Sequence, residues 1–560
     1  MVKNIFPLII VGLFAFVAGF PLLHKGLLPT HDGEYHVIRF YEFDKTLRDG
    51  NWYPRWAADL NNGYGVPLFN YVYPLPNYIA SFFHLLGSSF IDSFKLNMFF
   101  ATILGALFFY LWSRESWGKL GGVVSSIFYT FSPYHFVDIY IRGSVGEVWA
   151  LAFFPAFLWS ITRFIKHHQK IFFVASSIFL SLIIFSHNIL ALMFLPFSLS
   201  YIVFLLYKEK DKKYLMLNTL YLILLGLCLS AIFWLPAIVE AKYVTGLQIY
   251  NVSQHFPQLY NLVIPSWGSG FSQDLLTNQM SFQIGIANLV VVVISLPLMA
   301  FRHSVFSALT PSLSLRERVR VRVIIFFLVW FFLVFFLMLK VSLPIWHTIP
   351  FMNYFQFPWR FLSLEILVAS FLAGSVVYFW KSRVLAVFLI FLSFFLGIGY
   401  AKPAYYHYRN DNYYLTRSNF IDGTNSPGNL FNTIWMSRNL KKEKEKIKIV
   451  KGEGEITKLA ITPTHYKFYI FAHRPSEMVI NTAYFPGWTV FIDGREEKVR
   501  YNKDGVIAFS VPKGEHSVDI KLLNTNVQKL ASFATVVSVL YGVTLLAESL
   551  RGKLWRKQES

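Results

Sequence analysis

Two acidic residues stand two positions apart directly after the first apolar run of the chain. Asp32 and Glu34 lie in the segment THDGEYH, with His31 and His36 beside them. In a loop, both carboxylates can converge on one divalent cation, and carboxylate oxygens suit Mg²⁺ or Mn²⁺. One carboxylate can also act as a general base that removes the proton of an acceptor hydroxyl. The alternative is a solvated helix end, in which Asp32 caps a helix over 33–47.

Asp138, Arg142 and Glu147 form a second candidate group, within SPYHFVDIYIRGSVGEVWA. Arg142 is the one Lys or Arg in the loop predicted over 138–146. Its guanidinium fork is suited to a lipid phosphate or pyrophosphate. An ion pair of Arg142 with Asp138 or Glu147 inside the protein is the alternative, and the sequence leaves both interpretations open.

Three further polar residues lie at or near apolar runs. Arg360, in NYFQFPWRFLSLE, is a second candidate phosphate ligand, and interfacial snorkelling is its alternative. Arg55, in WYPRW, is a third and weaker candidate. His187, in FSHNILA, is either a polar group with a role at membrane depth or part of a short external turn.

The composition indicates which class of protein positions these residues. The chain has 560 residues, of which 55% are hydrophobic and 15% charged, and this excludes a soluble enzyme. The net charge of +20 does not indicate nucleic acid binding, because the basic residues lie mostly in short clusters between apolar runs. The single cysteine, Cys228, excludes an intramolecular disulfide. The first apolar run has no small-residue cleavage site, so a retained signal anchor is expected.

Twelve candidate spans predict a polytopic α-helical membrane protein. They are 5–23, 94–113, 120–137, 147–165, 171–186, 189–207, 214–236, 284–301, 323–341, 361–380, 384–401 and 527–547. Clusters of Lys and Arg between these runs all fall on one side if both termini are cytoplasmic. The short loops on the other side hold only Arg142 and Arg360. The candidate residues therefore face outward in the predicted topology, on a large first loop (24–93) and on later external loops.

The segment 402–526 has a different pattern. Stretches such as YKFYIFA, WTVFIDG and HSVDIKLL alternate with period two and are separated by turn residues. This pattern is typical of an extracytoplasmic antiparallel β-sandwich that follows a membrane domain over 1–401. A last helix and a basic cytoplasmic tail over 527–560 complete the prediction. The FPGW turn at Phe485 to Trp488 could stack on a sugar ring, but a packed turn in the sandwich core is favoured.

Several familiar site patterns are missing from the sequence. It has no Walker A loop, no G-x-G-x-x-G after a strand, no HExxH and no G-x-S-x-G. Nucleotide hydrolysis, hydride transfer and zinc proteolysis therefore find no support.

The segments THDGEYH, NGYGVPLFNYVYPLP, SPYHFVDIYIRGSVGE, SHN and FQFPWRFL together resemble a known group of proteins. A first span followed by an acidic external loop is similar to the GT-C superfamily of membrane glycosyltransferases. More closely, the chain resembles the YfhO-like and 6-pyruvoyl-tetrahydropterin synthase-related membrane proteins of bacteria. The tail, AYFPGWTVFIDGREEKV onward, is similar to the C-terminal end of the YfhO type.

The resemblance implies transfer of a sugar from a polyprenyl-phosphate carrier to an envelope glycan or glycolipid, outside the bacterial cytoplasmic membrane. It implies that Asp32 is the catalytic base or a metal ligand, with Glu34 as its partner. It also implies an assisting carboxylate at Asp138 or Glu147. Arg142 and Arg360 would then stabilise the leaving phosphate. The alternatives are a transporter or flippase for an envelope lipid, and a non-enzymatic envelope assembly protein.

Overall fold

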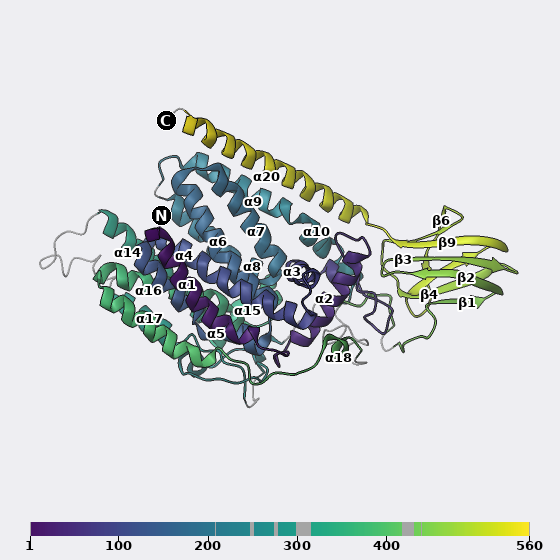
Figure 1. Cartoon of the computed structure of the whole chain (residues 1–560), viewed down its shortest axis with the longest axis horizontal. Helices are drawn as coiled ribbons and strands as arrows, with labels where there is room; N and C mark the ends of the chain where they lie inside the picture. Colours follow the sequence, from purple (N-terminus) through teal and green to yellow (C-terminus); the bar gives the residue numbers. More distant parts are fainter. Residues whose placement is uncertain are drawn as a thin grey trace, which may run out of the picture.

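The computed structural model describes residues 2–207, 209–246, 251–273, 278–297, 315–416, 431–437 and 440–558. At 2–4, 315–318 and 550–558 this description covers the backbone only. Helices form one large bundle, and the strands form a separate body at one end of the last helix, as Figure 1 shows. The chain is thus a polytopic helical membrane protein with a C-terminal antiparallel β region.

The helices follow the apolar runs of the sequence. In chain order they are α1 (Val2–Gly19), α2 (Gly33–Arg48), α3 (Leu75–Leu85), α4 (Phe90–Thr130), α5 (Pro133–Phe136), α6 (Val145–His167), α7 (Lys170–Ser186), α8 (Asn188–Leu206), α9 (Lys212–Leu229), α10 (Ala231–Val239), α11 (Leu259–Val263), α12 (Ile286–Ser295), α14 (Leu315–Met338), α15 (Leu343–Thr348), α16 (Leu362–Trp380), α17 (Arg383–Gly397), α18 (Asp411–Leu415) and α20 (Asn526–Gln558). Among the described residues, nine helices are long and apolar enough to cross a membrane.

The twelve predicted spans and these nine helices differ at three places. The predicted spans 94–113 and 120–137 share one helix, α4, which breaks at Gly118 with a φ of 72°. Helix α7 has 17 residues, and α12 has only 10 within the described part of the chain. The predicted span over 120–137 also ends early, because Pro133 begins the separate helix α5. The count of twelve therefore stays a prediction.

Small residues bring α4 and α16 together at the centre of the bundle. The Ser125 hydroxyl lies 3.2 Å from the Phe371 carbonyl oxygen, and the Gly374 amide donates to the Ser125 hydroxyl at 3.0 Å. A Cβ atom on Gly374 would lie 2.5 Å from that hydroxyl, so only glycine permits this approach. Close packing of small residues is the usual way in which helices associate within a membrane. Helix α16 is buried along almost its whole length.

The strands form two antiparallel sheets. They are β1 (Ile447–Lys451), β2 (Gly454–Ile461), β3 (His465–Ala472), β4 (Ser476–Ala483), β5 (Trp488–Ile492), β6 (Arg495–Glu497), β7 (Arg500–Tyr501), β8 (Val506–Val511) and β9 (Gly514–Leu522). One sheet has the order β1-β4-β8-β7 and the other β2-β3-β9-β5-β6. Alternate side chains of both sheets share one apolar core, as the sequence pattern predicts. Among the described residues of 402–526, the first strand begins at Ile447.

The FPGW turn belongs to this core. Phe485 and Trp488 are both buried, and the Trp488 ring stacks on Tyr466 with the centroids 5.3 Å apart. The favoured interpretation of a packed turn is therefore confirmed.

A segment of the first large loop completes the same core and joins the two bodies. The Trp56 ring is buried against Trp488, with the centroids 5.6 Å apart. The Ala483 amide donates to the Tyr64 carbonyl at 2.8 Å, and the Lys446 amine donates to the Gly63 carbonyl at 2.6 Å. The β region is thus fixed to the loop that carries α2.

Candidate functional site

Backbone hydrogen bonds hold the start of the first loop against the turn that follows α5. The His31 amide donates to the Ile141 carbonyl and the Asp32 amide to the Arg142 carbonyl, both at 2.9 Å. Residues Val137–Arg142 form a π-helical turn that ends at Gly143, whose φ is +65°. A Cβ atom on Gly143 would lie 2.4 Å from the Thr30 hydroxyl oxygen, so glycine is required there. Two predicted groups that are over 100 residues apart in sequence are therefore neighbours.

Asp32 is the residue that precedes the first turn of α2, but its side chain does not cap that helix. In the part of the chain that the structure describes, its carboxylate makes no hydrogen bond and no ion pair, and the side chain is half-buried. The interpretation of Asp32 as a capping residue is therefore not supported. Glu34 lies two residues further along, in the first turn of α2. Glu34 therefore lies on a helix, whereas the prediction of a shared cation places it with Asp32 in a loop.

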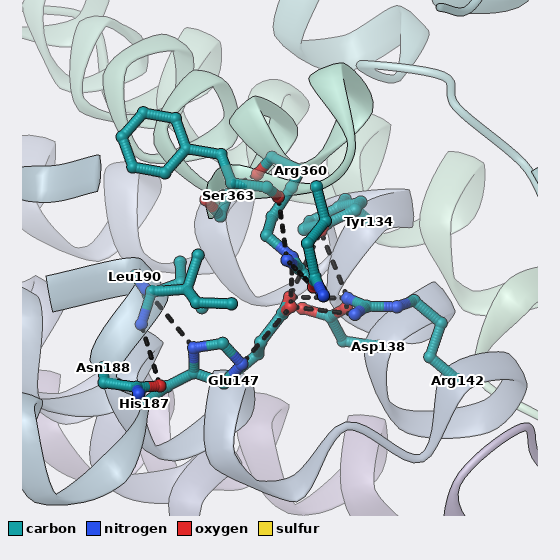
Figure 2. A network of polar contacts seen from close by, with 12 residues as sticks. Tyr134, Asp138, Arg142, Glu147, His187, Asn188, Leu190, Arg360 and Ser363 are labelled. Carbon is teal, nitrogen blue, oxygen red and sulfur yellow. Dashed lines mark hydrogen bonds and ion pairs between the residues drawn. The ribbon is translucent and has the colours of Figure 1, made fainter. Parts of the chain in front are cut away.

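The second predicted group is a cluster of buried charges, which Figure 2 shows. Arg142 Nη1 lies 2.5 Å from Asp138 Oδ1 and 2.5 Å from Glu147 Oε2. Arg142 Nη2 donates to Glu147 Oε1 at 2.8 Å, which makes the contact with Glu147 bidentate. The structure thus forms the ion pairs that were the alternative to a phosphate ligand.

Three other chain segments complete the shell around Glu147. Arg360, on the turn Pro358–Phe361 before α16, places its Nε 2.9 Å from Glu147 Oε1. The Tyr134 hydroxyl donates to Glu147 Oε2 at 3.3 Å. His187 lies in the break between α7 and α8, with its Nε2 3.8 Å from Glu147 Oε1 (Figure 2). Arg360 is 5% exposed, so it does not snorkel to the interface.

The cluster is buried, and burial together with the nearby Glu147 raises the pKa of the Asp138 carboxyl well above its ordinary value. Asp138 and Glu147 are completely buried, and Arg142 is 6% exposed. Two guanidinium groups face two carboxylates, and the Arg142 guanidinium also lies over the Trp359 ring at 4.8 Å. Charges within a membrane protein are costly unless they are paired, and they are usually functional. This cluster joins the π-helical turn, α6, the α7–α8 break and the start of α16. The backbone segment that carries Asp32 lies next to it, because the Asp32 amide donates to the Arg142 carbonyl.

The two histidines of THDGEYH are held neutral by their surroundings. Burial lowers the pKa of His36 well below its usual value, and the charges of Arg39 and His187 act in the same direction. Burial also lowers the pKa of His31, against the opposing effect of Asp32. The His31 ring lies 4.6 Å from that of Phe271, and its Nε2 is 2.8 Å from the Ser269 carbonyl oxygen. His31 thus fixes the loop at 269–271 over the site.

Sequence reasoning missed two residues of the site, Tyr73 and Arg39. The Tyr73 ring lies 5.1 Å from the His187 ring, and burial raises the Tyr73 pKa to about 12. A Cβ atom on Gly146 would lie 2.4 Å from the Tyr73 ring, so Tyr73 packs beside Glu147, and the charge of Arg39 lowers the pKa of Tyr73. Tyr73 is one of several tyrosines in this loop, and Arg39 belongs to no recognisable motif, so neither residue stands out in the sequence.

Arg55 lies outside the cluster. Its Nη1 donates to Asn70 Oδ1 at 2.8 Å and its Nη2 to the Ile232 carbonyl at 3.0 Å. Asn70 in turn donates to Glu240 Oε2 at 2.8 Å. Arg55 therefore belongs to a separate buried network that joins the first loop to α10.

The described residues hold no group of three or more His, Cys, Asp or Glu side chains placed to bind a metal ion. Asp138 and Glu147 are engaged by Arg142, and Asp32 and Glu34 alone do not supply the ligands that Mg²⁺ or Mn²⁺ requires. The expected metal ion stays a prediction, and no catalytic step is assigned to it.

Comparisons with known proteins give one family and several partial likenesses. A family model described as "6-pyruvoyl-tetrahydropterin synthase related domain; membrane protein" matches residues 69–403. An uncharacterized protein of Lactococcus lactis subsp. cremoris (strain MG1363) is 24% identical over 257 residues, which are 44% of this chain and 41% of that protein. This chain therefore covers less than half of that relative's length.

Two solved structures are also similar in part. The oligosaccharyltransferase of Archaeoglobus fulgidus in its apo form has 15% identity and a TM-score of 0.41, with 72% of this chain and 57% of that chain covered. The arabinofuranosyltransferase AftD from Mycobacteria has 13% identity and a TM-score of 0.41, with 70% and 27% covered. The range 69–403 of the family match contains the whole Glu147 cluster and begins after Asp32.

Proposed function

The chain belongs to the family of 6-pyruvoyl-tetrahydropterin synthase-related membrane proteins, and from this premise we propose that it is a GT-C-type membrane glycosyltransferase. The proposed reaction moves a sugar from a polyprenyl-phosphate carrier to a hydroxyl of an envelope glycan or glycolipid, on the extracytoplasmic face. The observation that carries the proposal is the Asp32 carboxylate. It is unengaged and half-buried, and it is held by backbone hydrogen bonds beside the buried Glu147 cluster.

Asp32 acts in this proposal as the general base. The acceptor oxygen forms a bond to the anomeric carbon of the sugar while the bond from that carbon to the phosphate oxygen breaks. The acceptor proton passes to the Asp32 carboxylate, and the electron pair of the broken bond leaves with the polyprenyl phosphate.

Arg142 and Arg360 act in this proposal by holding positive charge near the leaving phosphate. Both are already oriented by Glu147, and Arg142 by Asp138 as well, so no side chain must reorganise before the reaction. Preorganised charge in a buried site stabilises a developing anion more than the same charge does in water. Protonation of Asp32 removes one negative charge from the same region as the phosphate departs.

The β region has an indirect part in this proposal. Because Trp56 and Tyr64 join it to the first loop, it is placed to hold an acceptor near α2. Both termini are cytoplasmic in the proposed topology, and the β region is extracytoplasmic.

The test is transfer of radiolabelled sugar from polyprenyl-phosphate donors into envelope material by membranes that contain the full chain. The variant is Asp32→Ala, and the matched control is Asp49→Asn, an exposed carboxylate at the other end of α2. Expression and insertion of all three proteins are compared first. We expect transfer by the wild type and the control and none by Asp32→Ala.

Equal transfer by Asp32→Ala would remove Asp32 from the mechanism. The absence of wild-type transfer with every donor would contradict the transferase and favour transport or assembly of an envelope lipid.

A further inference from the structure

A cavity of about 230 Å³ lies at the same end of the bundle as the Glu147 cluster. Its wall is formed by the end of α4, the start of α5, the first turn of α12 and the end of α17. Ser132, in this wall, stands two residues before Tyr134, whose hydroxyl donates to Glu147. One water molecule needs only about 10–15 Å³ of cavity volume, so this cavity has room for a group of several heavy atoms.

The side chains that line the cavity carry no formal charge. The lining combines apolar residues and a glycine-containing segment with five uncharged polar residues, which are Ser132, Gln283, Asn288, Ser393 and Tyr400. A charged ligand would be buried there without a counter-charge, and burial of an unpaired charge is costly. The cavity therefore favours an uncharged ligand.

Two buried polar side chains of this lining have hydrogen-bonding atoms without a partner. Ser393, on α17, is 3% exposed, and its hydroxyl makes no hydrogen bond with any described residue. Gln283 is 2% exposed and donates from Nε2 to the Ser266 carbonyl at 2.7 Å, but its Oε1 accepts no hydrogen bond from the described residues. Buried polar atoms are nearly always hydrogen-bonded. A ligand with hydroxyl groups suits both side chains, because a hydroxyl donates and accepts.

The rim of the cavity is apolar. Ile286 on α12 and Leu396 on α17 both line the cavity, and each side chain is 40% exposed. α17 is one of the helices that are long and apolar enough to cross a membrane, so its exposed apolar side chains face lipid. The cavity thus has a polar interior behind a lipid-facing rim, which is the arrangement expected for a ligand that enters from the bilayer.

One loop connects this cavity with the segment that carries Asp32. Pro265 lines the cavity, and four residues further along, the Ser269 carbonyl oxygen lies 2.8 Å from His31 Nε2. Because an extended chain spans at most about 3.6 Å per residue, the Cα atoms of Pro265 and Ser269 lie within about 14 Å of each other. His31 directly precedes Asp32 in the sequence. A ligand in the cavity therefore lies beside the loop that covers the proposed general base.

We propose that this cavity binds the uncharged, hydroxyl-bearing headgroup of a lipid from the leaflet next to the candidate site. Gln283 Oε1 accepts a hydrogen bond from one headgroup hydroxyl, and the Ser393 hydroxyl bonds to the headgroup from the opposite wall. Ile286 and Leu396 contact the first carbons of the lipid chains. Diacylglycerol and a glycosyl-diacylglycerol share this chemistry. The identification of this lipid as the sugar acceptor rests on the proposed transferase function, whereas the binding itself does not.

Native mass spectrometry of the purified full chain tests the binding without any sugar donor. The protein is released from detergent in the presence of glucosyl-diacylglycerol, diacylglycerol, phosphatidylglycerol or methyl glucoside, and the retained ligand is counted for each. The variants are Ser393→Ala, which removes one hydroxyl, and Ser393→Phe, which fills the cavity. The control is Ser200→Ala on α8, whose hydroxyl donates to the Phe197 carbonyl of its own helix at 2.8 Å. Thermal unfolding shows whether each variant keeps its fold.

We expect both uncharged lipids to be retained in preference to phosphatidylglycerol. Ser393→Ala should weaken their retention about fivefold, Ser393→Phe should abolish it, and Ser200→Ala should leave it unchanged. Retention of glucosyl-diacylglycerol over diacylglycerol would place the sugar ring in the cavity, and the reverse would place the glycerol hydroxyl there.

Unchanged retention in both Ser393 variants would overturn the proposal. Equal retention of phosphatidylglycerol would overturn the requirement for an uncharged headgroup. Methyl glucoside bound as tightly as the glucosyl lipid would identify a site for soluble sugars instead. Lipid retention by a protein that transfers no sugar would support the site and remove only its role in binding the acceptor.

Discussion

Glu147 and Glu240 are both buried carboxylates, yet their surroundings differ in kind. Glu147 is completely buried and is held by the guanidinium groups of Arg142 and Arg360. Glu240 is 1% exposed and accepts hydrogen bonds from the neutral side chains of Asn70 and Gln528, at 2.8 and 2.9 Å. One carboxylate is therefore stabilised by charges and the other by dipoles.

The two networks also differ in the segments of the chain that they join. The partners of Glu240 come from the first loop and from the start of α20, and Thr525 also donates to it at 2.5 Å. The network thus fastens α20 to α10. The Glu147 cluster instead lies beside the Asp32 carboxylate, which makes no hydrogen bond or ion pair among the described residues. A buried carboxylate is therefore a poor indicator of a site by itself, and an unengaged charge beside it is a better one.

The largest expected effect comes from Arg142→Met. The substitution leaves Asp138 and Glu147 buried with one fewer cation, and removing one partner of a buried pair costs about 3–5 kcal/mol. We expect a marked fall in the unfolding temperature of the purified protein in mild detergent. Arg142→Lys keeps the charge but not the bidentate contact, so its fall should be smaller. An unfolding temperature equal to that of the wild type would show that the cluster does not stabilise the bundle.

Glu240→Gln should have an intermediate effect on stability and none on catalysis. The new amide presents an NH₂ group to donors, so one buried hydrogen bond is lost at a cost of about 1–3 kcal/mol. The measurement is the unfolding temperature together with sugar transfer per folded molecule. A loss of transfer in protein that remains folded would place Glu240 in the site and remove the distinction between the two networks.

A third buried carboxylate, Glu42, should make stability depend on pH. Burial raises its pKa from 4.5 to about 8, and the nearby Asp59 acts in the same direction. Between these values the folded state keeps the proton that the unfolded state releases, so stability falls as the pH rises from about 4.5 to 8. Glu42→Gln is neutral in both states and should lose this slope. Unfolding temperatures of both proteins from pH 5 to 9 provide the test, and equal slopes would contradict it.

Much of the fold could be predicted from the sequence because its signals are local. The alternating stretches YKFYIFA, WTVFIDG and HSVDIKLL of the C-terminal region became β3, β5 and β9. The strands β6 and β7 were missed because two or three residues carry too little periodicity, and β1 was missed because it overlaps the end of the charged run KKEKEKIKIV. The two spans predicted within α4 are separated by the polar stretch RESWGK at 114–119, and the structure breaks the helix in that stretch, at Gly118.

The site was predicted only in part, because its contacts are long-range. Spacing brought Asp138, Arg142 and Glu147 together correctly, since Asp138 and Arg142 lie on the π-helical turn and Glu147 follows in the first turn of α6. No local pattern could show that Arg360 reaches Glu147, or that Arg55 donates to Asn70 and the Ile232 carbonyl instead. These pairings depend on which helices pack side by side.

Asp32→Asn should have the smallest effect on stability of these substitutions. This substitution is the most direct test of Asp32 as the proposed catalytic base. The Asp32 carboxylate makes no hydrogen bond or ion pair within the described part of the chain, so the free energy of unfolding should change by less than about 0.5 kcal/mol. The asparagine cannot accept the acceptor proton as a carboxylate does, so sugar transfer should be lost. The measurement is sugar transfer and unfolding temperature on the same purified preparation. Lost transfer at unchanged stability is the predicted result, and retained transfer would contradict the assignment of Asp32 as the catalytic base.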